Sequence, residues 1–268
     1  MIKLNAMPSD PVILEWRMIL VRPRNPLNMG AAARAMANFG FRDLAIAAPY
    51  EPSWQETRSA VGAEDVIRNA HAVATLSEAL RGVALAVGTT SGQRRKFDRE
   101  LISLEDLPQW LRQQDARGRA AMLFGSEKTG LSNEDLSYCH AVVRIPTVTR
   151  CPSMNLGQAV AVCCYELARW RSDHSGQQSE GAEPVPDSPP SAQAYISPPA
   201  GIQSLEHLFE RAARVLDEAG YLKPKSRAAT LLKLRRMLIE RRLSSNEAKI
   251  LGGVLAQIEW KLRLTRRV

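Results

Sequence analysis

Three polar stretches and one shorter turn of this 268-residue chain hold the residue types that could do chemistry. They are NPLNMGAAARAM at 25–36, LFGSEKTGLSNEDL at 123–136, IPTVTRCPSMNLGQAV at 145–160 and VGTTSGQR at 87–94. Glu127 aside, none holds an acid close to a histidine, a serine followed by a base, or a carboxylate pair at a regular spacing. The residue types therefore argue against hydrolysis.

The same stretches are rich in Gly, Ser, Thr and Asn, which favours a nucleoside-like ligand held by main-chain hydrogen bonds. Ile145, Met154 and Leu156 would offer apolar walls to a flat base. Two common phosphate signatures fail: Leu131 stands where the lysine of a phosphate loop belongs, and NMGAAARAMANFG lacks GxGxxG.

Arg34 is the only charged residue of the alanine-rich segment 28–40. Alanines let another backbone approach a helix closely, so this guanidinium could lie beside a close-packed site. The simpler interpretation is a solvated charge on a helix surface.

Five short apolar runs, at 18–21, 44–49, 83–88, 120–125 and 141–146, alternate with segments of helix length. Such runs, bounded by Gly, Pro and Thr, are typical of strands buried on both faces, and a helix cap is expected at Ser103 with Asp106. The predicted fold class is α/β with a mainly parallel sheet, in which ligands gather at strand ends.

Composition divides the chain into residues 1–171, a proline-rich linker at 172–203 and a basic segment at 204–268. The linker holds six of the sixteen prolines, four acids and no lysine or arginine. Residues 204–268 carry 15 basic and 7 acidic residues, a net charge of +8 that equals that of the whole chain. Such a concentration of charge favours contact with nucleic acid.

The basic segment shows helical periodicity in three apolar stripes, which predict three amphipathic helices. Gly220 is expected to end the first, and a capping box at Ser244 and Glu247 to open the third. A bundle this small needs to pack on the first domain or on a second copy. The stripes are Leu205, Leu208, Phe209, Ala212, Val215 and Leu216; Leu231, Leu234 and Leu238; and Ile250, Leu251, Val254, Leu255, Ile258 and Leu262.

Composition and cysteine usage predict a cytoplasmic protein without a membrane segment. The amino terminus has no apolar leader, and the longest uncharged stretch in the part expected to fold, 151–165, is too short and polar to span a bilayer. Cys139, Cys151, Cys163 and Cys164 lack the spacing of a zinc site or disulfide framework, so reduced, mostly buried thiols and no metal are expected.

In order, the three long stretches resemble the three motifs of the SPOUT superfamily of RNA methyltransferases, in the branch that methylates ribose 2'-hydroxyls. The resemblance covers most of residues 17–170, and the added linker and helices are similar to those of tRNA-modifying members. It implies a deep trefoil knot, S-adenosylmethionine bound in the knot, and a homodimer whose subunits share each site. It also implies 2'-O-methylation of tRNA, at a cytidine or uridine that is the first anticodon-loop nucleotide.

The resemblance assigns roles to individual positions. Arg34 is the catalytic candidate; because arginine keeps its proton, we expect it to orient the adjacent phosphate and stabilise a developing alkoxide. In the third motif the order CPSMNL replaces a serine pair, so a hydrogen bond from the first serine is lost while backbone contacts to the donor remain. The donor contacts are Thr89, Thr90, Ser91, Gly125, Ile145, Pro152, Ser153, Met154 and Leu156. The catalytic set is Arg34, Asn28, Ser153, Asn155 and Glu127, and the RNA contacts are Arg22, Arg34, Arg94 and Arg95.

Several alternatives stay open at this level. Glu127 is either a cap for the turn before Asn133 or part of the site, and the run 94–96 is either a solvated charge cluster or an RNA contact. The chain could act on ribosomal RNA or another tRNA position, could bind RNA without catalysis, or could be an unrelated nucleotide-binding α/β protein.

Overall fold

The computed structural model describes residues 14–50, 54, 57–91, 101–114, 118–175 and 198–265. Its centre is a seven-stranded sheet in the order β3-β2-β1-β6-β4-β7-β5, with every pairing parallel. All five predicted strands are present; the two three-residue strands β3 and β5 are too short to show a pattern. The strands are β1 (Leu14–Val21), β2 (Asp43–Ala47), β3 (His71–Val73), β4 (Val83–Thr90), β5 (Leu101–Ser103), β6 (Gly118–Phe124) and β7 (Ala141–Arg144).

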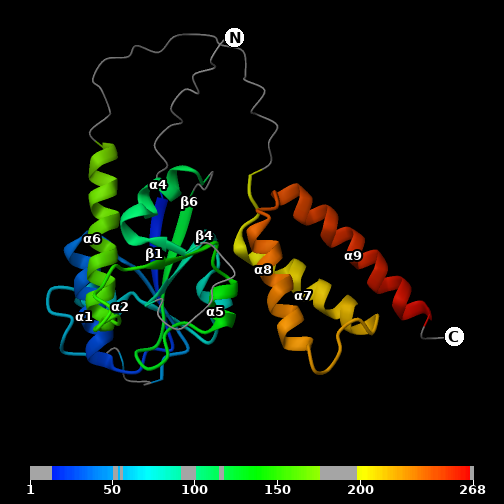
Figure 1. Ribbon diagram of the computed structural model, residues 1–268, viewed down its shortest axis with the longest axis horizontal. Helices are drawn as coiled ribbons and strands as arrows, with labels where there is room; N and C mark the ends of the chain where they lie inside the picture. Colours follow the sequence, from blue (N-terminus) through cyan, green and yellow to red (C-terminus); the bar gives the residue numbers. More distant parts are fainter. Residues whose placement is uncertain are drawn as a thin grey trace, which may run out of the picture.

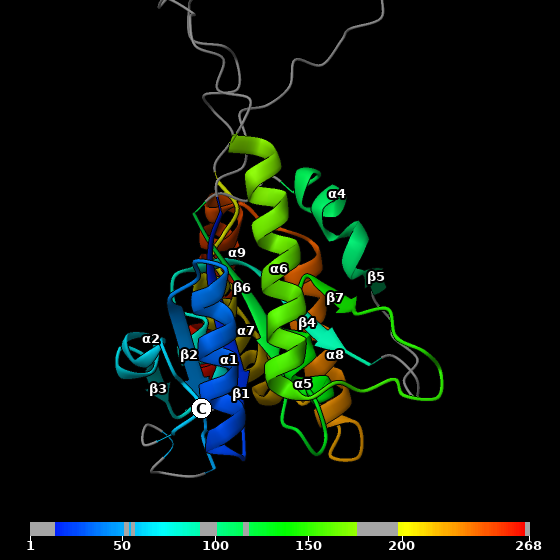
Figure 2. The ribbon, with the colours of Figure 1, turned by 90° about the vertical axis from the view of Figure 1, so that its left-hand side faces the viewer.

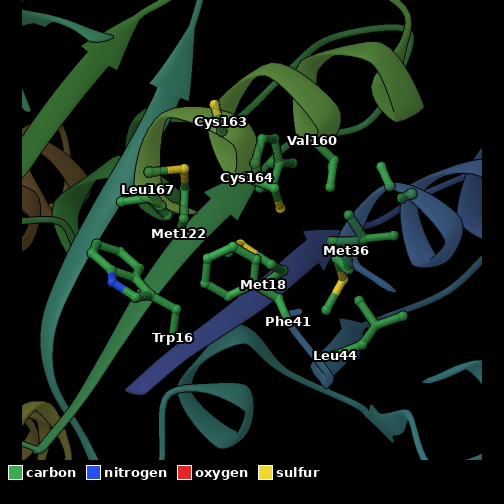
Figure 3. Packing of buried hydrophobic residues seen from close by; sticks show 14 of the residues in the cluster. Trp16, Met18, Met36, Phe41, Leu44, Met122, Val160, Cys163, Cys164 and Leu167 are labelled. Atoms are coloured by element: carbon green, nitrogen blue, oxygen red, sulfur yellow. The ribbon is translucent and has the colours of Figure 1, made fainter. Parts of the chain in front are cut away.

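Helices cover both faces of this sheet (Figure 1). One face packs on α1 (Pro26–Asn38), α2 (Glu64–Arg68), α4 (Leu107–Arg112) and α6 (Leu156–Ser175), and Figure 3 shows side chains of β1, β6 and α6 meeting there. The other face packs on α3 (Leu76–Ala79) and α5 (Asn133–Ser137). The two apolar layers explain why the central strands read as continuous apolar runs.

The alanines of α1 allow the close packing that the sequence predicts. Ala32 and Ala33 are fully buried, and α1 lies alongside α6 (Figure 2). A Cβ atom placed on Gly157 of α6 would lie only 2.8 Å from the Cβ of Ala31, so neither helix has room for a larger residue at this contact.

Three helices follow, as predicted: α7 (Ile202–Glu218), α8 (Arg227–Glu240) and α9 (Ser245–Thr265), together called the helical unit. Gly220 has a φ of +70° just beyond α7. The capping box is present, since the Ser244 amide donates to Glu247 Oε2 at 2.7 Å and the Glu247 amide to Ser244 Oγ at 3.2 Å. The segment interpreted as a linker thus begins within α6 and ends within α7.

The cap expected at Ser103 is wrong. Residues Leu104–Asp106 form a single 3₁₀ turn before α4, and no side chain caps it. Ser103 Oγ instead donates to Glu105 Oε1 at 3.1 Å.

The helical unit packs on the second face of the sheet, with Ile202 of α7 in that core. In contrast, the apolar stripe of α9 is largely exposed: Ile250 is 66 % and Val254 is 51 % accessible. None of the described helices combines the length and apolarity needed to cross a membrane. All four cysteines are free thiols, and only Cys151 is exposed.

Candidate active site

A cavity of about 540 Å³ lies at the carboxyl ends of β4, β6 and β7, where the loops after these neighbouring strands converge. All nine positions assigned to donor contact line it: Thr89, Thr90, Ser91, Gly125, Ile145, Pro152, Ser153, Met154 and Leu156. Glu127 lines it as well, and the structure adds Phe124, Ser126, Lys128, Thr129, Gly130, Leu131, Thr147 and Ala159. These additional residues all belong to the second and third motif stretches, so their place within these stretches could have identified them as cavity residues.

Side-chain hydroxyls hold the loops of the cavity in place. Thr89 Oγ1 donates to the carbonyl of Leu123 at 2.8 Å and joins the end of β4 to β6. Thr147 Oγ1 donates to the carbonyl of Pro152 at 3.1 Å and closes the third loop on itself. Pro152, which departs from the motif, thus keeps a backbone contact within the loop.

The loop after β6 requires glycine at two positions. The Gly130 amide donates to the Ser126 carbonyl at 2.7 Å, and Gly130 has a φ of +66°. A Cβ on Gly125 would lie 2.0 Å from the Gly130 carbonyl carbon and 2.1 Å from the Leu131 nitrogen. Because those atoms are backbone, any side chain at Gly125 would force the loop open.

A chain of amide hydrogen bonds joins all three motifs beside the cavity. Asn155 Nδ2 donates to Asn28 Oδ1 at 2.9 Å, and Asn28 Nδ2 donates to Glu127 Oε1 at 3.0 Å. The backbone amides of Arg24 and Asn25 also donate to the Glu127 carboxylate, at 2.9 and 3.1 Å. Predicted site residues from positions far apart in the sequence therefore form one network, here called the Glu127 network.

The geometry decides between the two interpretations of Glu127. Helix α5 is capped by Ser132, whose hydroxyl accepts from the Asp135 amide at 3.1 Å, and not by Glu127. Partial burial would raise the pKa of Glu127, but hydrogen bonds from Asn28 and from backbone amides outweigh burial and bring this pKa below its usual value. Glu127 is therefore an ionised acceptor that orients other groups at neutral pH.

Asn155 also fixes the start of α6. Its Oδ1 accepts from the Gly157 amide at 2.9 Å, the pattern of a helix cap. Because the cap occupies Oδ1, the side-chain amide must point its Nδ2 donor toward Asn28, and the orientation of the network follows.

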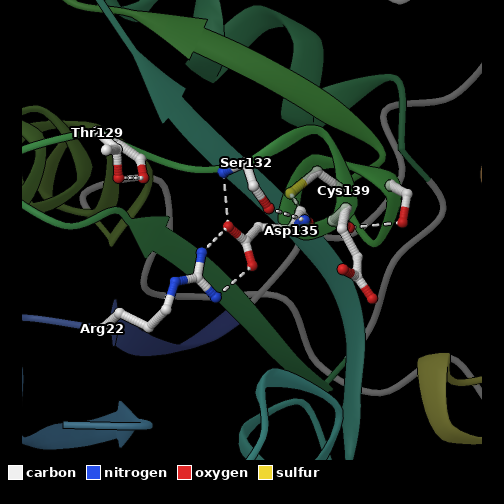
Figure 4. Close-up of polar contacts among 8 residues, drawn as sticks. Arg22, Thr129, Ser132, Asp135 and Cys139 are labelled. Atoms are coloured by element: carbon white, nitrogen blue, oxygen red, sulfur yellow. Dashed lines mark hydrogen bonds and ion pairs between the residues drawn. The ribbon is translucent and has the colours of Figure 1, made fainter. Parts of the chain in front are cut away.

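Arg22 has a structural partner. Its guanidinium forms a two-pronged ion pair with Asp135, whose side chain is 5 % exposed and also accepts from the Ser132 amide (Figure 4). This pair ties the end of β1 to α5. Contact of Arg22 with RNA stays a prediction.

Arg34 lies apart from the cavity of its own chain. Its side chain projects exposed from α1 and makes no hydrogen bond or ion pair with any residue that the structure describes. Arg94 and Arg95 lie outside the described residues. The assignment of these three arginines to catalysis or RNA contact therefore also stays a prediction.

Comparisons with known proteins agree over most of the chain. Residues 15–165 match the model of the SpoU rRNA methylase family, and residues 203–267 match the C-terminal domain of the tRNA methyltransferase TrmJ. The tRNA (cytidine/uridine-2'-O-)-methyltransferase TrmJ of Escherichia coli strain K12 is 34 % identical over 250 residues, which cover 91 % of this chain and 94 % of that protein.

Solved structures show the same likeness. The crystal structure of TrmJ from Z. mobilis ZM4 has a TM-score of 0.73 at 29 % identity, covering 91 % of this chain and 98 % of that one. A probable methylase family protein from Haemophilus influenzae Rd KW20 has a TM-score of 0.56 at 26 % identity, covering 94 % and 99 %. With one family model spanning more than half of the chain and a relative aligned along nearly all of it, the chain belongs to the SpoU methylase family, in its TrmJ group.

Proposed function

We propose that this protein transfers a methyl group from S-adenosylmethionine to a ribose 2'-hydroxyl of tRNA, at a cytidine or uridine that is the first nucleotide of the anticodon loop. The observation that carries the proposal is the Glu127 network, which brings Asn28 and Asn155 together beside the cavity. The chain's TrmJ relatives are named for cytidine and uridine 2'-O-methylation of tRNA.

The residues of the cavity fit the methyl donor. About 540 Å³ lies within the range of small-molecule sites, roughly 300–1,000 Å³. Ile145, Met154 and Leu156 supply apolar surface for an adenine ring, and the hydroxyls of Thr90 and Ser91 supply polar contacts. Bound there, S-adenosylmethionine would supply an electrophilic methyl group. A knotted course of the chain around the donor is part of the proposal, as the resemblance to the SPOUT superfamily implies.

The chain's own groups would position the nucleophile. A ribose hydroxyl is weakly nucleophilic, so the enzyme must align its oxygen with the methyl group and stabilise the developing negative charge. The Glu127 network fixes the side-chain amides of Asn28 and Asn155 through hydrogen bonds that involve no proton transfer. The Ser153 side chain lies at the cavity wall, and Arg34 would supply the positive charge.

A homodimer with shared sites accounts for the position of Arg34, which is exposed on α1 and absent from the lining of its own cavity. We assign this guanidinium to the cavity of a second copy. The exposed apolar stripe of α9 supports self-association, and the net charge of +8 on residues 204–268 supports binding of tRNA.

The first experiment measures transfer of labelled methyl from S-adenosylmethionine to an unmodified tRNA transcript. A second transcript already carries a 2'-O-methyl group at the first anticodon-loop nucleotide. Label on the first and none on the second is the expected result. Label on neither transcript, with donor binding intact, would contradict the proposal. Ribosomal RNA would then be the next substrate to test, because the matching family is named for methylation of rRNA.

The shared site has its own test, in which two inactive variants are combined. Arg34→Ala keeps the cavity, whereas Gly125→Val keeps Arg34 and blocks the loop. Differently tagged chains, copurified as a heterodimer, should regain one working site if Arg34 acts in the partner's cavity. If Arg34 acts in its own chain, the heterodimer stays inactive and the assignment fails.

A further inference from the structure

Two loops at neighbouring strand ends form a fixed rim next to the Glu127 network. The Arg22 amide donates to the Ala47 carbonyl at 2.8 Å, and the Tyr50 amide donates to the Pro23 carbonyl at 3.1 Å. Ala48 has a φ of +51°, a left-handed conformation that a non-glycine residue adopts only when its surroundings impose it. The backbone between β2 and Tyr50 is therefore held against the loop that opens α1.

This rim holds an aromatic ring and a cation in solvent. The Tyr50 side chain is 66 % exposed, and the Cζ atom of Arg24 lies 4.4 Å from the centroid of its ring. Arg24 forms no ion pair with the residues that the structure describes, while its backbone amide donates to Glu127 at 2.9 Å. An exposed tyrosine stacked on an arginine without an ion-pair partner contributes little to a hydrophobic core. The backbone that carries these two side chains is nevertheless held in place by the hydrogen bonds of the rim.

We propose that Tyr50 and Arg24 form a stacking platform for an unpaired base of the RNA substrate, with the Arg24 guanidinium contacting a neighbouring phosphate. The proposal rests on the proposed function, since it takes RNA as the substrate. Single-stranded bases are recognised by stacking on aromatic rings and arginine planes, and their phosphates by basic side chains. Neither side chain lines the donor cavity, so the platform binds RNA beside the reacting ribose and not the methyl donor.

Coupling to the Glu127 network gives the platform a role in positioning. Arg24 presents its side chain to Tyr50 and its backbone to Glu127, which in turn holds Asn28. A base stacked on Tyr50 is thereby fixed relative to the groups that align the nucleophile. Tyr50 and Arg24 are positioning residues in this scheme, because neither contacts the reacting atoms.

The test compares Tyr50→Leu with Tyr50→Phe, which keeps the stacking ring and serves as the matched control. With an anticodon stem–loop RNA as substrate, Tyr50→Leu should lower kcat/KM for RNA about tenfold, the size expected for loss of one stacked base. Tyr50→Phe should stay within about twofold of the wild type, and KM for S-adenosylmethionine should not change in either variant. Arg24→Gln should reduce the salt dependence of RNA binding by about one phosphate contact.

A binding readout separates this inference from the proposed function. The same RNA carrying 2-aminopurine in its loop should lose fluorescence when it binds the wild type or Tyr50→Phe, and not when it binds Tyr50→Leu. If the wild type transfers no methyl group yet quenches the probe through Tyr50, the proposed function fails and the platform stands.

Two results would overturn the platform. One is unchanged kcat/KM and unchanged quenching in Tyr50→Leu. The other is a fall in the molar mass of Tyr50→Leu in solution, which would show that Tyr50 packs against a second copy and not against a base.

Discussion

Arg235 of α8 makes one of the contacts that join the helical unit to the sheet domain. Its guanidinium lies 2.8 and 3.0 Å from the two carboxylate oxygens of Glu206, with side chains that are 12 % and 9 % exposed. It also lies between two rings, with Cζ 4.1 Å from the centroid of Phe209 and 4.4 Å from that of Tyr138. Tyr138 follows α5, so Arg235 bridges the helical unit and the sheet domain.

Arg235→Met should loosen the helical unit, because the methionine fills the space between the rings but leaves Glu206 without its cation. Breaking a nearly buried ion pair costs about 3–5 kcal/mol. Since about a tenth of each side chain is still exposed to water, we expect the free energy of unfolding to fall by about 3 kcal/mol. Part of this loss comes from the two cation–π contacts. Adding Glu206→Gln to this variant should restore most of the loss, because glutamine removes the unpaired charge and still offers Tyr138 an acceptor.

The assay is urea denaturation combined with amide hydrogen exchange of α7 and α8. The control is Arg227→Met, which breaks a pair with Asp217 that is half exposed and should cost much less. A loss below about 1 kcal/mol for Arg235→Met would show that solvent screens the pair as it does at a surface. A double variant no more stable than the single one would refute the argument that the penalty comes from the unpaired carboxylate.

Three further predictions concern the cavity. Gly125→Ala should abolish donor binding, measured by calorimetry, because its Cβ would lie 2.0 Å from the backbone of Gly130. Glu127→Gln should lower the free energy of unfolding. The pKa of Glu127 lies below its usual value of 4.5, so the difference in unfolding free energy between wild type and variant should be complete above pH 4.5. It should shrink as the pH falls through the lowered pKa. At pH 8 a thiol reagent should modify the exposed Cys151 first, since burial raises the pKa of Cys164 to about 12 and that of Cys163 well above its usual range. S-adenosylmethionine should slow this labelling, because Cys151 precedes the cavity residue Pro152; equal rates with and without donor would contradict the placement of the site.

The position of the cavity was predictable because a parallel sheet brings the carboxyl ends of its strands to one edge. Thr89 directly follows one apolar run, and Gly125 and Ile145 lie at the ends of two others. Those three runs form adjacent strands, so the loops after them had to meet. The contacts within the site were not predictable in the same way. Asn28 and Asn155 stand 127 positions apart, and their pairing depends on the helix cap that fixes the Asn155 side chain.

The helical unit shows the limit of periodicity as evidence. Its stripes correctly predicted three helices, because apolar spacing determines which residues share a face. Spacing does not determine what covers that face: Leu205 and Leu208 of α7 are buried, while Ile250 and Val254 of α9 remain exposed in the single chain. The stacking of Arg24 on Tyr50 could not be predicted from the sequence either, because it depends on how two loops are held together.

Helix α5 contacts both the sheet domain and the helical unit, two parts that the sequence analysis describes as separate segments. Its five residues directly follow the cavity loop, and the Arg22–Asp135 pair holds them to β1. Arg235 of the helical unit contacts the far end of α5, where it reaches Ser137 Oγ at 3.4 Å and stacks on Tyr138. Helix α5 therefore contacts the helical unit at one end and directly follows the cavity loop at the other.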